Sequence, residues 1–247
     1  MRKPLNWLLK KPFIKKLVWK HMGSYGRARG KIVMRHRVTG MYTNEHLLDR
    51  VKLIWNLPGL VVGFERNRIV KTYLALVAYP VGVFAYVSAC AGQKIGDRVL
   101  TGWCVPLKIG NSLPLSEIPL NIKINSLEAV PGSGATYVRS PGCWALILAK
   151  NNLLAKILFK NGTIKFFDLN CLATIGRVSN IHWKSFKLRK AGQRFHFGGR
   201  PRVRGVAKNP VDHPHGGGKG KKSKNSVPES PWGRLGARKK KNVKIFF

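Results

Sequence analysis

The sequence predicts an all-β fold of two small barrels, flanked by a basic N-terminal arm and a glycine-rich C-terminal tail. Residues from about 31 to about 190 are rich in β-branched and aromatic side chains and are interrupted by Gly, Pro and Asn, a composition typical of many short strands. Hydrophobic residues make up 44% of the chain, which is enough for one or two small cores. The last 57 residues contain 15 Lys or Arg, 10 Gly and 5 Pro and cannot form a core of their own. The boundaries that we expect are an arm over 1–30, barrels over 31–105 and 106–190, and a tail over 191–247.

Apolar runs in the first predicted barrel have the pattern of a β-hairpin. The run 69–79 is followed by a turn of sequence PVG at 80–82 and then by a second apolar run, 83–90. Gly96-Asp97 marks a further turn. These signals predict two antiparallel strands with a tight connection.

The second predicted barrel contains three strand-like runs, at 144–149, 153–160 and 163–169. Asn-Asn and Asn-Gly pairs connect them, and Asn-Gly between apolar runs is the strongest short signal for a hairpin. The segment 102–119, which is rich in Gly, Asn and Pro, lies between the two groups of strands, and we interpret it as a link. Closed barrels would remove the exposed strand edges.

The charge balance indicates the kind of partner. The chain has 46 Lys or Arg and only 9 Asp or Glu, which gives a formal net charge of +37. Such like charge destabilises a compact protein by self-repulsion, so we expect a nucleic acid to neutralise it. The four cysteines are far apart without a CxxC pair, which favours a reducing compartment over a zinc ribbon or a disulfide framework. The apolar stretches are well short of the roughly 20 residues that span a bilayer, so we expect no transmembrane helix.

The opening segment carries basic charge mixed with large apolar side chains, and no acid precedes Glu45. One interpretation is an organelle-targeting peptide or a membrane-surface helix, against which Pro4, Pro12 and the absence of Ser before Ser24 argue. The other, which we favour, is a retained basic arm packed on RNA. We expect the C-terminal tail to be extended and to become ordered only by threading into RNA, the alternative being a solvated, disordered tail.

One tail segment, residues 199–218 with the sequence GRPRVRGVAKNPVDHPHGGG, strongly resembles the signature of the universal large ribosomal subunit protein two family. The sequence SPWG at 230–233 and the basic run at 238–241 look like that family's C-terminal end. The resemblance covers nearly everything after residue 25, with further matching segments at 30–37, 108–115, 118–119 and 173–176.

The resemblance implies an OB-fold barrel, then an SH3-like barrel, then an extended tail, all bound to large-subunit ribosomal RNA. It also implies a tail that reaches toward the peptidyl-transferase region, and a globular part near the subunit interface that supports subunit association and tRNA binding. Asp212 and His213 match family positions once proposed to assist peptide-bond formation. The implied partners are large-subunit rRNA, neighbouring ribosomal proteins and the small subunit across the interface, and we expect neither a membrane span nor a homo-oligomer.

The chain departs from the family pattern in three places. Lys219 stands where the family usually has an acid after its triple glycine, and residues 38–43 replace a glycine-rich basic loop. The arm before Gly23 resembles nothing in the family. These departures, the scarcity of acids and the abundance of Trp, Phe, Asn and Lys favour a mitochondrial member in the matrix mitoribosome, with a chloroplast or bacterial ribosome as the alternative.

The predicted RNA contacts lie in the segment before residue 38 and in the tail. Arg200, Arg202 and Arg204 alternate at strand spacing, so an extended chain would project them to one side, where their planar forks suit phosphate pairing. The alternative for them is a charged face neutralised by diffuse ions. The histidines of the HPH sequence can hydrogen-bond phosphates, 2′-hydroxyls or base edges, and glycines permit close backbone approach to RNA. Trp232 is expected either to stack on a base or to anchor the tail to protein. The complete predicted set is Arg35, His36, Arg37, Arg200, Arg202, Arg204, Lys208, Asn209, Asp212, His213, His215, Gly216, Gly217, Gly218, Lys219, Lys221, Lys222, Trp232, Arg238 and Lys239.

Asp212, His213 and His215 bring an acid, a potential base and two possible metal ligands close together in sequence. We nevertheless interpret the chain as a structural protein and not as an enzyme. No Cys lies nearby to complete a four-ligand zinc site, the other acids form no convincing carboxylate pair, and there is no GxxxxGK[ST] phosphate loop. We expect no metal site and no cofactor, and magnesium ions near the tail would belong mainly to the RNA. The rival functions are an RNA-processing enzyme with ribosome-like RNA-binding domains and a basic protein at a membrane surface.

Overall fold

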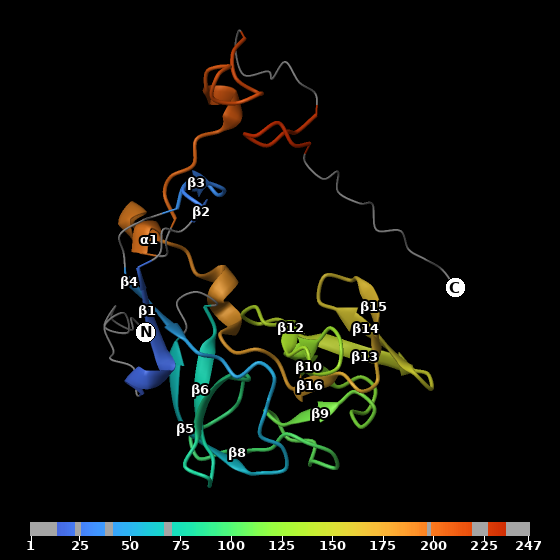
Figure 1. Ribbon diagram of the computed structural model, residues 1–247. Coiled ribbons are helices and arrows are strands. Elements are labelled where there is room, and N and C mark those ends of the chain that lie inside the picture. The colour runs from blue at the N-terminus through green and yellow to red at the C-terminus, as the bar shows by residue number, and fades with distance from the viewer. Residues whose placement is uncertain are drawn as a thin grey trace. The chain divides into compact units, whose positions relative to one another are not determined.

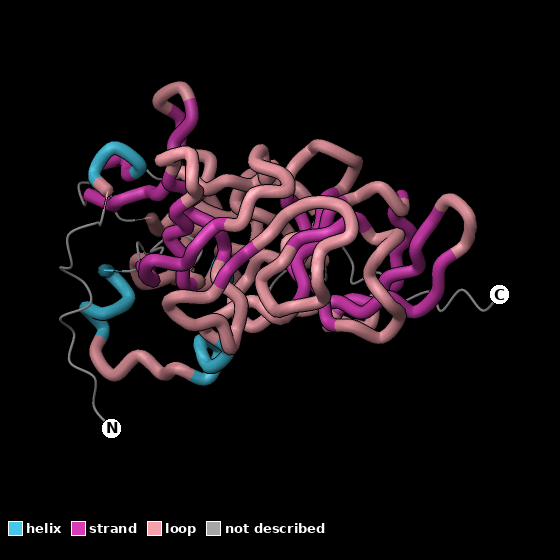
Figure 2. Tube along the Cα trace, turned by 90° about the horizontal axis from the view of Figure 1, so that it is seen from below, coloured by secondary structure: helices cyan, strands magenta, loops and turns pink. Residues whose placement is uncertain are grey.

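The computed structural model describes residues 14–22, 26–37, 42–66, 71–196, 199–218 and 227–235. The chain divides into two compact units. The barrel unit combines Met1–Gly23 with Gly40–Arg189, and the tail unit combines Ser24–Thr39 with Lys190–Phe247. Short strands joined by loops make up most of the described chain (Figure 2), so the all-β prediction is confirmed. None of the described helices has the length and apolar character needed to cross a membrane.

The first barrel, an OB-fold barrel, is built on a four-stranded antiparallel sheet (Figure 1). Burial alternates along its longest strand, where Val61 is buried and Leu60 and Val62 are exposed, as expected for a sheet with one face on a core. The predicted hairpin is confirmed, because Ala78 pairs with Phe84 across a tight turn. The strands, in the order β7-β6-β5-β8 across the sheet, are β5 (Gly59–Arg66), β6 (Tyr73–Ala78), β7 (Phe84–Ser88) and β8 (Arg98–Val99).

Part of the segment predicted as an arm packs against this barrel. A 3-10 turn, η2 (Lys15–Leu17), leads into β1 (Val18–Met22), which pairs with β4 (Tyr42–His46) in antiparallel register. Leu17 packs on a buried cluster that includes Tyr86. Apolar side chains of the opening segment therefore contribute to the protein core.

The second barrel, which is SH3-like, contains a six-stranded antiparallel sheet. The apolar runs predicted at 144–149, 153–160 and 163–169 form an antiparallel meander in this sheet. The Asn161-Gly162 turn joins the last two runs as expected, and the Phe159 N–H donates to the Thr163 carbonyl at 2.9 Å. A small hairpin of β11 (Leu127–Glu128) and β12 (Ala135–Tyr137) lies beside the sheet. The sheet strands, in the order β15-β14-β13-β10-β16-β9, are β9 (Ser112–Pro114), β10 (Lys123–Asn125), β13 (Ala145–Lys150), β14 (Leu154–Phe159), β15 (Ile164–Asp168) and β16 (Leu172–Ile175).

The segment 102–119, interpreted from sequence as a link, contributes a strand to the second barrel. Strand β9 lies at the sheet edge and is buried along its whole length. Its polar residue is accommodated because the hydroxyl oxygens of Ser112 and Thr174 lie 2.8 Å apart in a buried hydrogen bond. Pro114 has no backbone N–H to donate, and an edge strand tolerates proline because its outer side pairs with no further strand of the sheet. This strand therefore could not be recognised from composition alone.

The remaining elements are short. In the barrel unit, the 3-10 turn η3 (Ile181–Ser185) follows the second barrel. The tail unit contains β2 (Arg27–Ala28) paired with β3 (Lys31–Ile32), and it also holds α1 (Ala191–His196), the one α-helix among the described residues, and the 3-10 turn η4 (Gly205–Ala207).

A buried carboxylate holds the loop between β11 and β12. The Glu128 side chain is 1% exposed, and its oxygens accept the backbone N–H groups of Gly132 at 3.2 Å, Gly134 at 3.0 Å and Leu172 at 3.0 Å. Three charge-assisted hydrogen bonds offset the cost of burying the charge.

We predict that Glu128→Ala lowers the free energy of unfolding by about 3 kcal/mol or more, because it leaves three backbone donors without an acceptor. Urea unfolding followed by circular dichroism at raised ionic strength measures this change. Asp97→Ala is the control, since Asp97 accepts only the exposed Lys94 N–H; its expected effect is under about 1 kcal/mol. Equal destabilisation of the two variants would contradict the prediction.

Candidate nucleic-acid interface

Two stretches that are distant in sequence pair within the tail unit. Arg37 forms an antiparallel bridge with Gly199, and the Arg200 N–H donates to the His36 carbonyl at 3.0 Å. His36 has a left-handed backbone, with φ of 63°. The predicted RNA contacts Arg35, His36 and Arg37 therefore lie beside the start of the tail segment 199–218.

A compact set of turns holds the HPH sequence. The Asn209 carbonyl accepts the His213 N–H at 3.3 Å, and the Lys208 carbonyl accepts the Gly217 N–H at 3.2 Å. Gly216 is buried against these turns, and a Cβ there would lie 2.3 Å from the Asn209 carbonyl oxygen. Glycine is thus required at 216 for close packing of the chain on itself. Its close approach to RNA stays a prediction.

The two histidines connect this segment to the region around residue 230. The His213 Nδ1 accepts the His215 backbone N–H at 3.0 Å, and the His215 Nε2 accepts the Glu229 backbone N–H at 3.0 Å. Because a backbone N–H can only donate, the proton of neutral His213 lies on Nε2. The His215 Nε2 also lies 3.3 Å from the Val227 carbonyl oxygen. The ring centroids are 4.8 Å apart. The histidines therefore have a structural role before any ligand binds.

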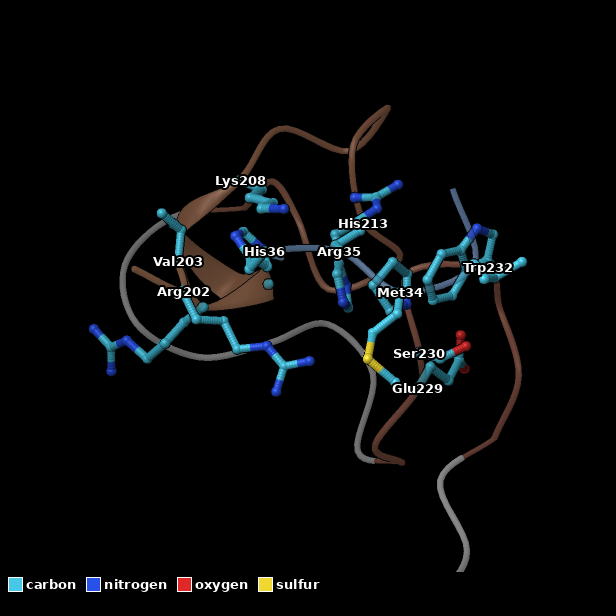
Figure 3. A pocket seen from close by; sticks show the side chains of 14 residues that line it. Met34, Arg35, His36, Arg202, Val203, Lys208, His213, Glu229, Ser230 and Trp232 are labelled. Carbon is cyan, nitrogen blue, oxygen red and sulfur yellow. The ribbon is translucent and has the colours of Figure 1, made fainter. Parts of the chain in front are cut away.

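A pocket of about 510 Å³ lies within the tail unit, a volume in the range of ligand sites (Figure 3). Four parts of the chain contribute to its wall: the segment after β3, the segment around η4, His213 and the segment around Pro231. Its lining residues are Val33, Met34, Arg35, His36, Arg202, Val203, Arg204, Gly205, Lys208, His213, Glu229, Ser230, Pro231 and Trp232.

Positive charge dominates this wall. The Arg35 guanidinium lies 5.4 Å from the centroid of the Trp232 ring, a cation–π distance, and its Nη1 lies 3.5 Å from the Asp212 carbonyl oxygen. The Trp232 ring is still 51% exposed. Glu229 is the single acid among the lining residues, against the four cations Arg35, Arg202, Arg204 and Lys208.

The surroundings of His213 favour its neutral form. Burial lowers the pKa of this histidine below its ordinary value of 6.5, and nearby His215, Lys208 and Arg35 lower it further, opposed by Glu229. The ring is therefore uncharged near pH 7. It lines the pocket as a neutral hydrogen-bonding group.

The structure brings some of the predicted contacts together and not others. Those that line the pocket are Arg35, His36, Arg202, Arg204, Lys208, His213 and Trp232. Those that lie in the tail unit without lining it are Arg37, Arg200, Asn209, Asp212, His215, Gly216, Gly217 and Gly218. Those that fall outside the described residues are Lys219, Lys221, Lys222, Arg238 and Lys239.

Sequence reasoning missed Gly205, Met34 and Glu229. A Cβ at Gly205 would lie 2.6 Å from Cε1 of His213, so glycine is needed for the imidazole to pack there. Gly205 is inside the recognised segment, and Glu229 is one of only two acids in the tail. Those two signals were present in the sequence, whereas nothing in it distinguishes Met34.

The arrangement is suited to binding an anion or a planar ring. Exposed arginine forks, a lysine, a neutral histidine and an exposed indole line the same pocket. Among the residues that the structure describes, no three His, Cys, Asp or Glu side chains are grouped so as to hold a metal ion. The His213 Nδ1 is already occupied by the His215 N–H.

Comparison with known proteins gives consistent matches. The profile of the family described as "Ribosomal Proteins L2, C-terminal domain" matches residues 108–233. The chain is 40% identical over 221 residues to large ribosomal subunit protein uL2m of Reclinomonas americana, covering 89% of this chain and 80% of the relative. It is 38% identical to uL2 of Hyphomonas neptunium, over 83% of this chain and 75% of the relative. It is 39% identical to uL2 of Chromobacterium violaceum, over 88% and 79%.

We predict that Gly216→Ala opens the turns around His213, because the new Cβ would meet backbone atoms that cannot move aside. Hydrogen exchange should show reduced protection of the Gly216 and Gly217 amides. Gly192→Ala is the matched control in the tail unit, since a Cβ there meets nothing within 4 Å. Unchanged protection in Gly216→Ala would contradict the prediction.

We further predict that acidification destabilises the tail unit through His213. Its folded-state pKa lies below the unfolded value near 6.5, so the unfolded chain takes up the proton first as the pH falls. The contribution of His213 to the free energy of unfolding is therefore complete above the unfolded-state pKa and is lost as the pH falls through the folded-state pKa. An NMR titration of the imidazole should give a midpoint below 6.5, and His213→Gln should remove this part of the pH dependence while the exposed-site control His182→Gln keeps it. A midpoint at or above 6.5 would contradict the assignment.

Proposed function

Because the chain belongs to the family of large ribosomal subunit protein uL2, we propose that it is a structural constituent of the large ribosomal subunit and binds its ribosomal RNA. The observation that carries the proposal is the pocket wall of the tail unit, where four cations face a single acid. Phosphates neutralise such a wall, and arginine forks bind them in pairs of parallel hydrogen bonds.

The pocket offers more than charge. Trp232 presents a half-exposed ring on which a base can stack, and Arg35 supports that ring from the protein side. The neutral His213 carries its proton on Nε2 and can donate to a phosphate, a 2′-hydroxyl or a base acceptor. Stacking and directed donors suit folded RNA with unpaired bases better than a uniform duplex.

We infer further that the tail unit lies near the peptidyl-transferase region and that the barrel unit supports subunit association and tRNA binding. The support is the resemblance of residues 199–218 to the family signature, including Asp212 and His213. The partners in this proposal are large-subunit rRNA, neighbouring ribosomal proteins and the small subunit. In this proposal the chain acts as a scaffold and not as an enzyme, since its relatives are large ribosomal subunit proteins.

We also propose that the compartment is the mitochondrial matrix. The support is the similarity to uL2m, the mitochondrial relative, together with the scarcity of acids and the departures from the usual family pattern. The bacterial relatives are nearly as similar, at 38% and 39% identity, and a bacterial or chloroplast ribosome is the alternative.

Sedimentation of a tagged full-length chain through a gradient of mitochondrial lysate, followed by RNA crosslinking, tests the function. We expect comigration with the large subunit and crosslinks that cluster in the catalytic region of its RNA. A chain that stays at the top of the gradient with scattered RNAs would overturn the proposal in favour of RNA processing. Comigration only with chloroplast or bacterial subunits would overturn the compartment alone.

We predict that the double variant Arg202→Gln/Arg204→Gln weakens binding to a large-subunit rRNA fragment and reduces the slope of log affinity against log salt by about two, one for each phosphate that the variant no longer neutralises. The affinity is measured over a series of KCl concentrations. The control is Lys94→Gln/Arg98→Gln, which removes two exposed cations from the barrel unit. The same slope change in both variants would indicate diffuse charge binding and contradict a specific wall.

A further inference from the structure

A cluster of cations and aromatic rings on the barrel unit lies outside the site described above. Trp183, on η3, stacks with Phe186 at 5.9 Å between ring centroids and 13° between planes. The Arg66 guanidinium lies 4.8 Å from the centroid of the Trp183 ring, and the Lys71 ammonium lies 5.4 Å from it. Residues separated by more than a hundred positions are thus brought to one place.

Backbone contacts position this cluster. Asn180 has a left-handed backbone, with φ of 59°, and its side-chain amide donates to the Lys71 carbonyl at 2.7 Å. The Ser179 Oγ accepts the Tyr73 N–H at 3.1 Å, and the Ser179 N–H donates to the Ala89 carbonyl at 3.0 Å. The segment that carries Trp183 is therefore tied to the first barrel before any ligand binds.

The exposed ring of the pair is in a strongly basic environment. Phe186 is 56% exposed although it stacks on a partner ring, so burial in the core does not explain its position. Lys184 and Lys187 flank it and are exposed. No Asp or Glu occurs in the sequence between Asp168 and Asp212. A stacking surface surrounded by cations is the usual composition of a site for unpaired nucleotides.

We propose that Phe186, supported by Trp183, is a stacking platform for an unpaired base of RNA, with Lys184 and Lys187 contacting the adjacent phosphates. Arg66 and Lys71 act on Trp183 through cation–π contacts and keep the supporting ring in place. Every base has a π face, so this site selects unpaired over duplex RNA more strongly than it selects sequence. The inference rests on the proposed function, which supplies RNA as the ligand.

Binding of the full-length chain to a short single-stranded RNA and to a duplex of the same length tests the platform. The salt concentration is set high enough to weaken phosphate contacts elsewhere on the protein. Phe186→Ala should weaken single-strand binding roughly 5- to 150-fold and leave duplex binding nearly unchanged. Phe186→Tyr, which keeps the ring, should restore the affinity. Phe166→Ala is the matched control, because Phe166 on β15 is 62% exposed; it should change neither affinity.

The outcomes separate this inference from the proposed function. Thermal unfolding of Phe186→Ala should match that of the unaltered chain, since the ring is more than half exposed. A variant that binds single-stranded RNA as tightly as the unaltered chain, or whose affinity falls equally for both RNAs, would overturn the platform. Continued sedimentation of that variant with the large subunit would leave the proposed function standing.

Discussion

The carboxylates of this chain accept hydrogen bonds mainly from its own backbone. Glu65 differs, since its Oε2 lies 2.7 Å from the His46 Nε2 and its Oε1 accepts a hydrogen bond from the Tyr86 hydroxyl at 2.6 Å. Leaving aside Arg66 and Arg189, no lysine or arginine in the described ranges forms an ion pair with a carboxylate. In the described ranges, the acids that accept a backbone N–H therefore stabilise turns and loops. Among the described residues, the acids that accept a backbone N–H include Asp49, Asp97, Glu117, Glu128 and Asp168.

Neutral backbone carbonyls hold several of the cations instead. A carbonyl orients an ammonium or guanidinium group without cancelling its charge, so the side chain loses part of its rotational freedom before a ligand arrives. The positive charge of each such side chain then remains available to a polyanion, at the cost of self-repulsion in the free protein. The cation-to-carbonyl contacts are Lys150 to Ser116 at 2.7 Å, Lys160 to Gly142 at 3.3 Å, Arg177 to Gly142 at 3.1 Å and Arg35 to Asp212 at 3.5 Å.

Sequence reasoning succeeded where partners are neighbours along the chain. The β6–β7 hairpin and the β13–β14–β15 meander were predictable because Gly and Asn-Gly turns separate adjacent apolar runs. Strand β9 was not, since its partner strand, β16, comes about sixty residues later and its sequence reads as a loop. In the site, a recognisable segment identified Arg202 and His213. The role of Glu229 depends on a hydrogen bond to His215 that only the folded chain reveals.

The tail unit depends on hydrogen bonds more than on apolar packing. All three clusters of buried hydrophobic residues found among the described residues belong to the barrel unit. The tail unit has instead a buried histidine, glycines that permit close packing and four cations around one pocket. Repulsion among these cations opposes the folded arrangement, and a bound array of phosphates removes it. A ligand that binds only the folded form stabilises that form by mass action, so the proposed binding of RNA would be thermodynamically coupled to folding of the tail unit.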